Sequence, residues 1–64
     1  MPPADERDDV IFEYIQFGNS TRVVAVDCAT GTEVTIQVPS SLSSADMQSV
    51  ALKKLIYVLD KQKE

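Results

Sequence analysis

The chain contains 64 residues with a formal net charge of −4, one cysteine and no histidine. This length is enough for one small domain and leaves no room for a second core. A single cysteine excludes an internal disulfide, and without histidine a zinc site would consist of Cys28 and carboxylates, a poor structural ligand set. Small domains usually depend on a disulfide, a metal or a partner subunit. Association with another chain is therefore the support that the composition leaves open.

The negative charge is concentrated at the N-terminus. Residues 1–9 contain four acidic side chains and one basic side chain, whereas the remainder contains six acidic and five basic ones. Two prolines and the lack of an apolar anchor before Val10 predict that residues 1–9 form a disordered acidic tail. Such tails usually aid solubility, and an acidic arm that docks on a basic partner is the alternative. Residues 10–62 are expected to form a single domain.

The sequence shows no targeting signal. Its N-terminus has neither the basic nor the apolar region of a secretory signal peptide. Uninterrupted apolar stretches are much shorter than the roughly 20 residues that cross a bilayer. A lone cysteine suits a reducing compartment. We therefore expect a cytoplasmic protein without membrane association.

Two segments near the N-terminus predict a β-hairpin. Residues 10–17 are rich in aromatic and β-branched side chains, which favour a pleated, half-buried surface. Gly18 and Asn19 follow, and both residue types tolerate the positive φ of a tight hairpin turn. Residues 21–26 then predict the returning strand.

A second turn and a third strand are expected next. In the turn over 27–32, Asp27 can hydrogen-bond forward to the turn backbone, and Gly31 can adopt the left-handed conformation. Residues 33–38 alternate strictly between apolar and polar side chains, which predicts one inward face and one wet face. Pro39 is expected to end this strand because it has no amide to continue the ladder.

Residues 44–62 predict one amphipathic helix. Ser43 or Ser44 can cap its N-terminus, and Ser43 with Asp46 resembles a capping box. The β-β-β-α order predicts an α+β fold, a three-stranded antiparallel meander of order 1-2-3 packed against one C-terminal helix. The apolar arc of the helix is wide, close to half the circumference. It comprises Met47, Ala51, Leu52, Leu55, Ile56, Val58 and Leu59.

The first two predicted strands are apolar on both faces, so the hairpin register decides the core. A shift of one residue determines whether Phe12 and Tyr14 face the helix or face away from it. The other set, Ile11, Ile15 and Phe17, then lies on the opposite side. The expected core comprises Val23 or Val24, Ala25 or Val26, Val34, Ile36, Val38, Ala51, Leu52, Leu55 and Leu59.

A single helix covers only one face of this sheet, so apolar surface remains for a partner. The wide helical arc indicates the same. We therefore expect a small non-enzymatic interaction module that forms a homodimer or binds another protein through a sheet face, a sheet edge or a helix flank. The candidate interaction surface comprises Phe12, Tyr14, Ile15, Phe17 and Tyr57.

No residue pattern predicts a catalytic, metal-binding or cofactor-binding site. Cys28 lies beside an acidic residue rather than a cation that would activate a thiol, and the chain has no histidine to act as its base. Glu13 would be a candidate acid if it were buried, but we expect it to face solvent or to pair with Arg22. A small enzyme that relies on Glu13 or Cys28 is therefore the weakest alternative.

The main alternative is a nucleic-acid-associated regulator that uses Arg22, Lys53 and Lys54. A three-stranded sheet backed by a helix is an architecture that can enter the DNA major groove. Such modules need cations on the exposed sheet face to contact phosphates. Here Arg22 is the only basic residue in the predicted strands, and the net charge is −4, so nucleic-acid binding is disfavoured.

Three segments carry a family resemblance: F-E-Y-I-Q-F-G-N-S (Phe12 to Ser20), V-D-C-A-T-G-T-E-V (Val26 to Val34) and A-L-K-K-L-I-Y-V-L (Ala51 to Leu59). With the β-β-β-α pattern, the chain resembles a family of short bacterial proteins without a known activity. Members usually have proline where Cys28 stands, which further disfavours catalysis by this cysteine. The resemblance implies no cofactor and no catalytic residue.

Overall fold

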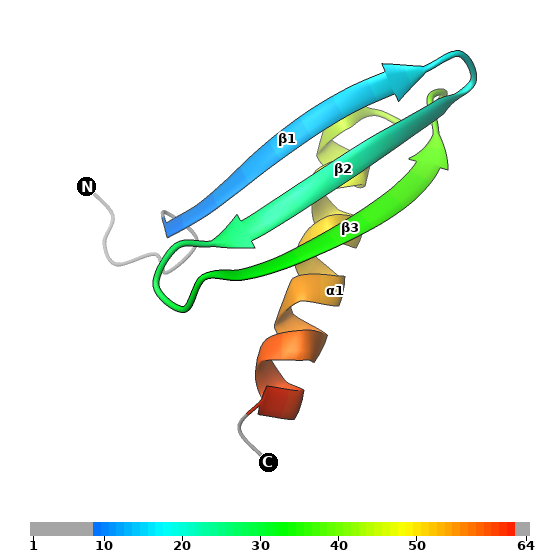
Figure 1. Ribbon diagram of the computed structural model, residues 1–64. Helices are drawn as coiled ribbons and strands as arrows, with labels where there is room; N and C mark the ends of the chain where they lie inside the picture. Colours follow the sequence, from blue (N-terminus) through cyan, green and yellow to red (C-terminus); the bar gives the residue numbers. More distant parts are fainter. Residues whose placement is uncertain (1–8, 63–64) are drawn as a thin grey trace.

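The computed structural model describes residues 9–62, which form a three-stranded antiparallel sheet and one helix. The elements are β1 (Val10–Phe17), β2 (Ser20–Asp27), β3 (Thr32–Pro39) and α1 (Ser44–Gln62). The strands lie in the order β1-β2-β3, and α1 crosses one face of the sheet obliquely (Figure 1). The predicted α+β fold with β-β-β-α order is confirmed.

The element boundaries differ from the predicted ones in three details. β2 and β3 each extend one residue further at both ends. Pro39 is therefore the last residue of β3, opposite Ser20, rather than the residue after the strand. The acidic tail lies outside the described residues except for Asp9, which belongs to the domain because its carbonyl accepts a hydrogen bond from the Cys28 amide (2.8 Å).

The two-residue turn at Gly18 and Asn19 fixes the register of β1 against β2. Gly18 has a φ of 58°, in the left-handed region that glycine adopts without strain. With Phe17 closing the turn, Tyr14 lies directly opposite Val23. Because directly opposite residues share a face of the sheet, this register assigns every side chain of the hairpin to one side or the other.

The register also decides the core. Val23 and Ala25 face α1, whereas their neighbours Val24 and Val26 lie on the opposite face of β2. The buried cluster between sheet and helix consists of Val23, Ala25, Val34, Met47, Ala51 and Leu55; the predicted residues Ile36, Val38, Leu52 and Leu59 are partly buried and pack against it.

The turn between β2 and β3 is closed by hydrogen bonds from within its own residues. Gly31 has a φ of 76°, and its amide donates to the carbonyl of Asp27 (2.7 Å). The carboxylate of Asp27 accepts the hydroxyl of Thr30 (2.7 Å) rather than a turn amide. The forward hydrogen bond expected of Asp27 is present, but its donor is a side chain.

The helix begins where its cap predicts. The Oγ of Ser43 accepts the Asp46 amide (3.0 Å), and its carbonyl accepts the Met47 amide (3.0 Å). Ser43 is thus the N-cap, and it satisfies amides that have no partner within the helix. Asp46 in the first turn and Lys61 in the last turn complement the helix dipole.

Replacement of Leu55 by alanine should truncate the largest fully buried side chain among the described residues. Leu55 is fully buried, and a truncation of this kind costs about 2–5 kcal/mol. Ile56→Ala is the matched control, because the neighbouring Ile56 is exposed and its loss should cost less than about 1 kcal/mol. Urea unfolding followed by far-ultraviolet circular dichroism measures both values; equal losses would contradict the assigned core.

Replacement of Ser43 by alanine should lower the free energy of unfolding by about 1 kcal/mol, because the Asp46 amide loses its acceptor. Ser44→Ala is the control, since Ser44 is the first residue of α1 and alanine has the higher helix propensity. Thermal unfolding of the two variants compares them directly. A Ser44→Ala protein as unstable as Ser43→Ala would place the cap elsewhere.

Candidate interaction surface

The structure distributes the five candidate surface residues over three places. Phe12 and Tyr14 lie on the side of β1 that faces α1, and Ile15 and Phe17 lie on the opposite side. Tyr57 is exposed on α1, with the ammonium of Lys61 5.8 Å from its ring centroid. The candidates therefore do not form one contiguous surface, although four of the five belong to β1.

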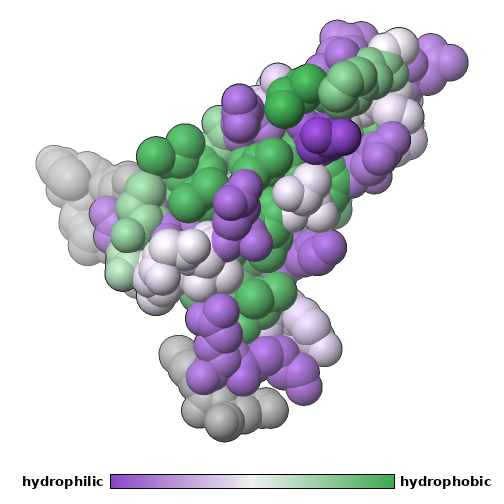
Figure 2. All heavy atoms as spheres, in the orientation of Figure 1, coloured by the Kyte–Doolittle hydropathy of each residue, from purple (hydrophilic) through white to green (hydrophobic). Residues whose placement is uncertain are grey.

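The face of the sheet turned away from α1 carries exposed apolar side chains from β1. Ile11 is 60% exposed and Phe17 is 53% exposed, while Val24 between Glu13 and Thr35 is nearly buried. Figure 2 views this face and shows green apolar surface along β1 and β2, interrupted by purple hydrophilic groups. This is the face that the helix leaves uncovered.

The helix also leaves part of β1 uncovered on its own side of the sheet. α1 packs mainly against β2 and β3. Tyr14, on the helix side of β1, is consequently 40% exposed, and Ile56 on the helix is 44% exposed. Ile56 belongs to the wide apolar arc but not to the expected core, and its exposure shows that the arc is wider than the part of the sheet that α1 covers. β1 therefore presents apolar side chains on both faces.

The outer edge of β1 carries backbone groups that no strand within residues 9–62 pairs with. The bond from the Cys28 amide to the Asp9 carbonyl marks a hydrogen-bonded pair. Because such pairs alternate along an antiparallel ladder, Ile11, Glu13 and Ile15 direct their amides and carbonyls toward β2. The alternate residues of β1 direct their amides and carbonyls outward, away from β2: Val10, Phe12, Tyr14 and Gln16.

The opposite edge of the sheet is protected. By the same alternation Thr35 directs its carbonyl away from β2, and the ammonium of Lys54 donates to that carbonyl (3.2 Å). Pro39 at the end of β3 has no amide to offer, and the charged Glu33 lies near the start of the strand. Charged side chains, lysine above all, and proline are the devices that keep edge strands from pairing. β1 contains neither lysine nor proline.

The residues considered for catalysis lie apart. Glu13 is exposed on the face away from α1, as expected, and Cys28 is exposed in the turn between β2 and β3. Within residues 9–62, no group of three or more histidine, cysteine or acidic side chains is placed to hold a metal ion.

The three cations of the nucleic-acid alternative are also separated. Arg22 lies on the sheet face away from α1, where its guanidinium stacks 5.2 Å from the ring centroid of Phe17. Lys53 and Lys54 lie on α1, behind the sheet in the view of Figure 1. A nucleic-acid-binding surface built from these residues has no support from their positions.

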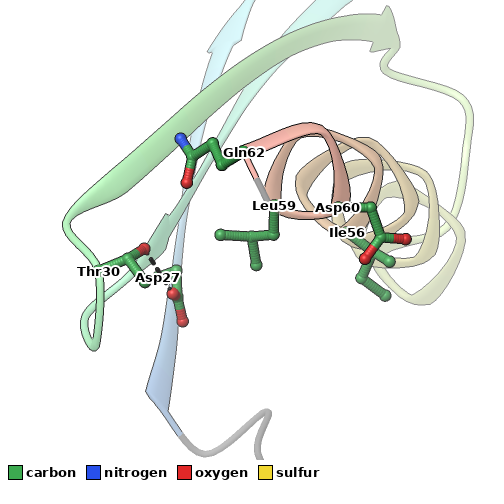
Figure 3. A pocket seen from close by; sticks show the side chains of 6 residues that line it. All are labelled: Asp27, Thr30, Ile56, Leu59, Asp60 and Gln62. Atoms are coloured by element: carbon green, nitrogen blue, oxygen red, sulfur yellow. Dashed lines mark hydrogen bonds between the residues drawn. The ribbon is translucent and has the colours of Figure 1, made fainter. Parts of the chain in front are cut away.

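A shallow groove of about 440 Å³ lies between the C-terminal half of α1 and the turn after β2. Figure 3 shows Leu59 pointing from the helix toward this turn, where Thr30 is bonded to Asp27. The carboxylate of Asp27 and the hydroxyl of Thr30 in this groove are therefore engaged with each other. The lining residues are Asp27, Thr30, Ile56, Leu59, Asp60 and Gln62.

Two features of the sheet were not recognised from the sequence: the exposure of Ile11 and the contact between Lys54 and the edge of β3. Ile11 was placed on the second face of β1 but not among the candidates, and it is more exposed than any of them except Tyr57. Lys54 was considered for phosphate binding, whereas it protects the edge of β3. Its role depends on where the helix crosses the sheet, which no local pattern encodes.

The family model described as a domain of unknown function (DUF6898) matches residues 7–63. The chain belongs to this family. No curated protein and no solved structure matches the chain significantly. No helix in the described part combines the length and apolar character needed to cross a membrane. Membership in DUF6898 agrees with the expected family without a known activity.

Replacement of Thr30 by valine should test whether the polar lining of the groove stabilises the turn. The hydroxyl of Thr30 lies 2.7 Å from Asp27 and 2.8 Å from the hydroxyl of Thr32. Its loss should lower the free energy of unfolding by about 1–2 kcal/mol, because Asp27 is buried and loses a donor. Thr30→Ser retains the hydroxyl and should cost less than about half as much. Equal effects in urea unfolding would show that the hydroxyl is dispensable.

Proposed function

We propose that the protein is a small non-enzymatic interaction module that forms a homodimer through β1. One observation carries this proposal: β1 is an edge strand without lysine or proline, and it exposes large apolar side chains on both faces, Ile11 and Phe17 on one and Tyr14 on the other. Exposed large apolar side chains gathered along one strand support a protein–protein contact there.

The small core supports the same proposal. Leu55 and Val23 are the only large side chains among the described residues that are fully buried. A chain of this size without a disulfide usually has only a few kcal/mol of stability, and a partner subunit adds buried apolar area. Dimer formation would supply the area that the single helix leaves uncovered.

The finer features of the proposal rest on the sequence. The lone exposed Cys28 suits a reducing compartment, which supports the cytoplasm. The three segments quoted above support a bacterial origin. The surface described here is apolar rather than nucleophilic or acid–base in character, which supports a role in interaction over catalysis.

Replacement of Phe17 by aspartate should dissociate the homodimer. A carboxylate buried in an apolar contact costs several kcal/mol, so the dissociation constant should rise by at least about 100-fold. Tyr14→Asp should have the same effect from the other face of β1. Both variants should keep the circular dichroism spectrum of the folded chain, because neither side chain belongs to the buried cluster.

Light scattering over a range of concentrations, at low and high salt, measures the solution mass of each variant. Gln37→Asp is the matched control, since Gln37 is an exposed strand residue on protected β3. The parent and the control should be dimers at both salt concentrations, because an apolar contact is not screened. A monomeric parent, or aspartate variants with the mass of the parent, would refute the proposal.

A further inference from the structure

We propose that two copies join antiparallel along the β1 edges into one continuous six-stranded sheet, with Tyr14 on the two-fold axis. This inference rests on the proposed self-association and specifies its geometry. The β1 edge offers a row of unpaired amides and carbonyls and is unprotected, whereas β3 is protected by Lys54 and Pro39. Two copies can therefore pair strand to strand only through the β1 edge of each.

Symmetry restricts the possible registers to a few. In an isologous contact both copies use the same edge. The two-fold axis then lies midway between one residue of β1 and the same residue of the partner subunit. Residues at equal distances on either side of that residue then lie opposite each other. An axis at Glu13 aligns residues 10–16 of the two copies, and an axis at Tyr14 aligns residues 11–17. An axis further from the middle of β1 aligns a shorter stretch.

Charge decides between the two long registers. An axis at Glu13 places this carboxylate directly opposite Glu13 of the partner subunit, and like charges in that position destabilise a strand pair. An axis at Tyr14 places each Glu13 opposite Ile15 of the partner subunit instead. Charge repulsion therefore disfavours the first register and leaves the second.

Side-chain packing favours the same register. With the axis at Tyr14, Ile11 lies opposite Phe17 of the partner subunit, so the two most exposed large apolar side chains of the sheet cover each other. On the helix side, Tyr14 meets Tyr14 of the partner subunit. The outward backbone groups of Phe12 and Tyr14 become hydrogen-bonded in this register, which satisfies the free edge.

Disulfide trapping tests the register in a Cys28→Ser background, which removes the native thiol. The single substitutions Tyr14→Cys and Gln37→Cys are oxidised mildly and followed by non-reducing electrophoresis; both leave Glu13, whose charge sets the register, in place. Two residues on the axis have Cα atoms about 5.5 Å apart, within the range of a disulfide. Tyr14→Cys should therefore form the covalent dimer at least about tenfold faster than the β3 control Gln37→Cys.

Amide hydrogen exchange of the unsubstituted chain provides a second readout. The Phe12 and Tyr14 amides should exchange at least about tenfold more slowly in the dimer than after dilution to monomer, whereas the Glu13 and Ile15 amides, bonded within the hairpin, should change less.

The outcomes separate the two proposals. A dimer by light scattering in which the Phe12 and Tyr14 amides are protected, but Tyr14→Cys is trapped no faster than Gln37→Cys, would overturn the register. A dimer in which no β1 cysteine is trapped above the control, and the Phe12 and Tyr14 amides stay unprotected, would overturn edge pairing and leave self-association standing. A monomer at all concentrations would overturn both.

Discussion

The two-residue turn at Gly18 and Asn19 is the constraint on which the rest of the structure depends. It pairs Phe17 with Ser20 and thereby sets every cross-strand pair of the first hairpin. A slip of one residue would exchange the two faces of β1 and move Tyr14 away from the helix. It would also exchange the backbone groups that point outward. Both the buried cluster and the free edge follow from this turn.

The small residues in the core determine how the helix sits on the sheet. Ala25 and Ala51 are both fully buried, so the backbones of β2 and α1 can approach closely. Close approach leaves space for few large side chains, and the core is correspondingly modest. The helix has 19 residues and is about 28 Å long, more than the sheet beneath it can cover. Ile56 and Tyr57 remain exposed beside the fully buried Leu55, because the sheet covers only one side of α1.

The fold was predictable because local signals determine each element. Glycine turns, strict alternation before Pro39 and the Ser43 cap all act within a few residues of where they stand. The sequence did not reveal which face of the hairpin packs against the helix, because Val23 and Val24 are chemically identical and only the register distinguishes them. The candidate surface was divided between two faces for this reason. Membership in DUF6898 is consistent with the fold and names no activity.

The hydrogen bond from Lys54 to Thr35 has a consequence for how large any assembly can become. A sheet with two free edges can add chains indefinitely, as in a fibril, because each addition exposes a fresh edge. In the proposed dimer only the β1 edge of each copy pairs, so the addition of one copy uses the pairing edge of both. Under that proposal a lysine on the helix makes assembly self-limiting, and its replacement by a neutral side chain would open the route to filaments.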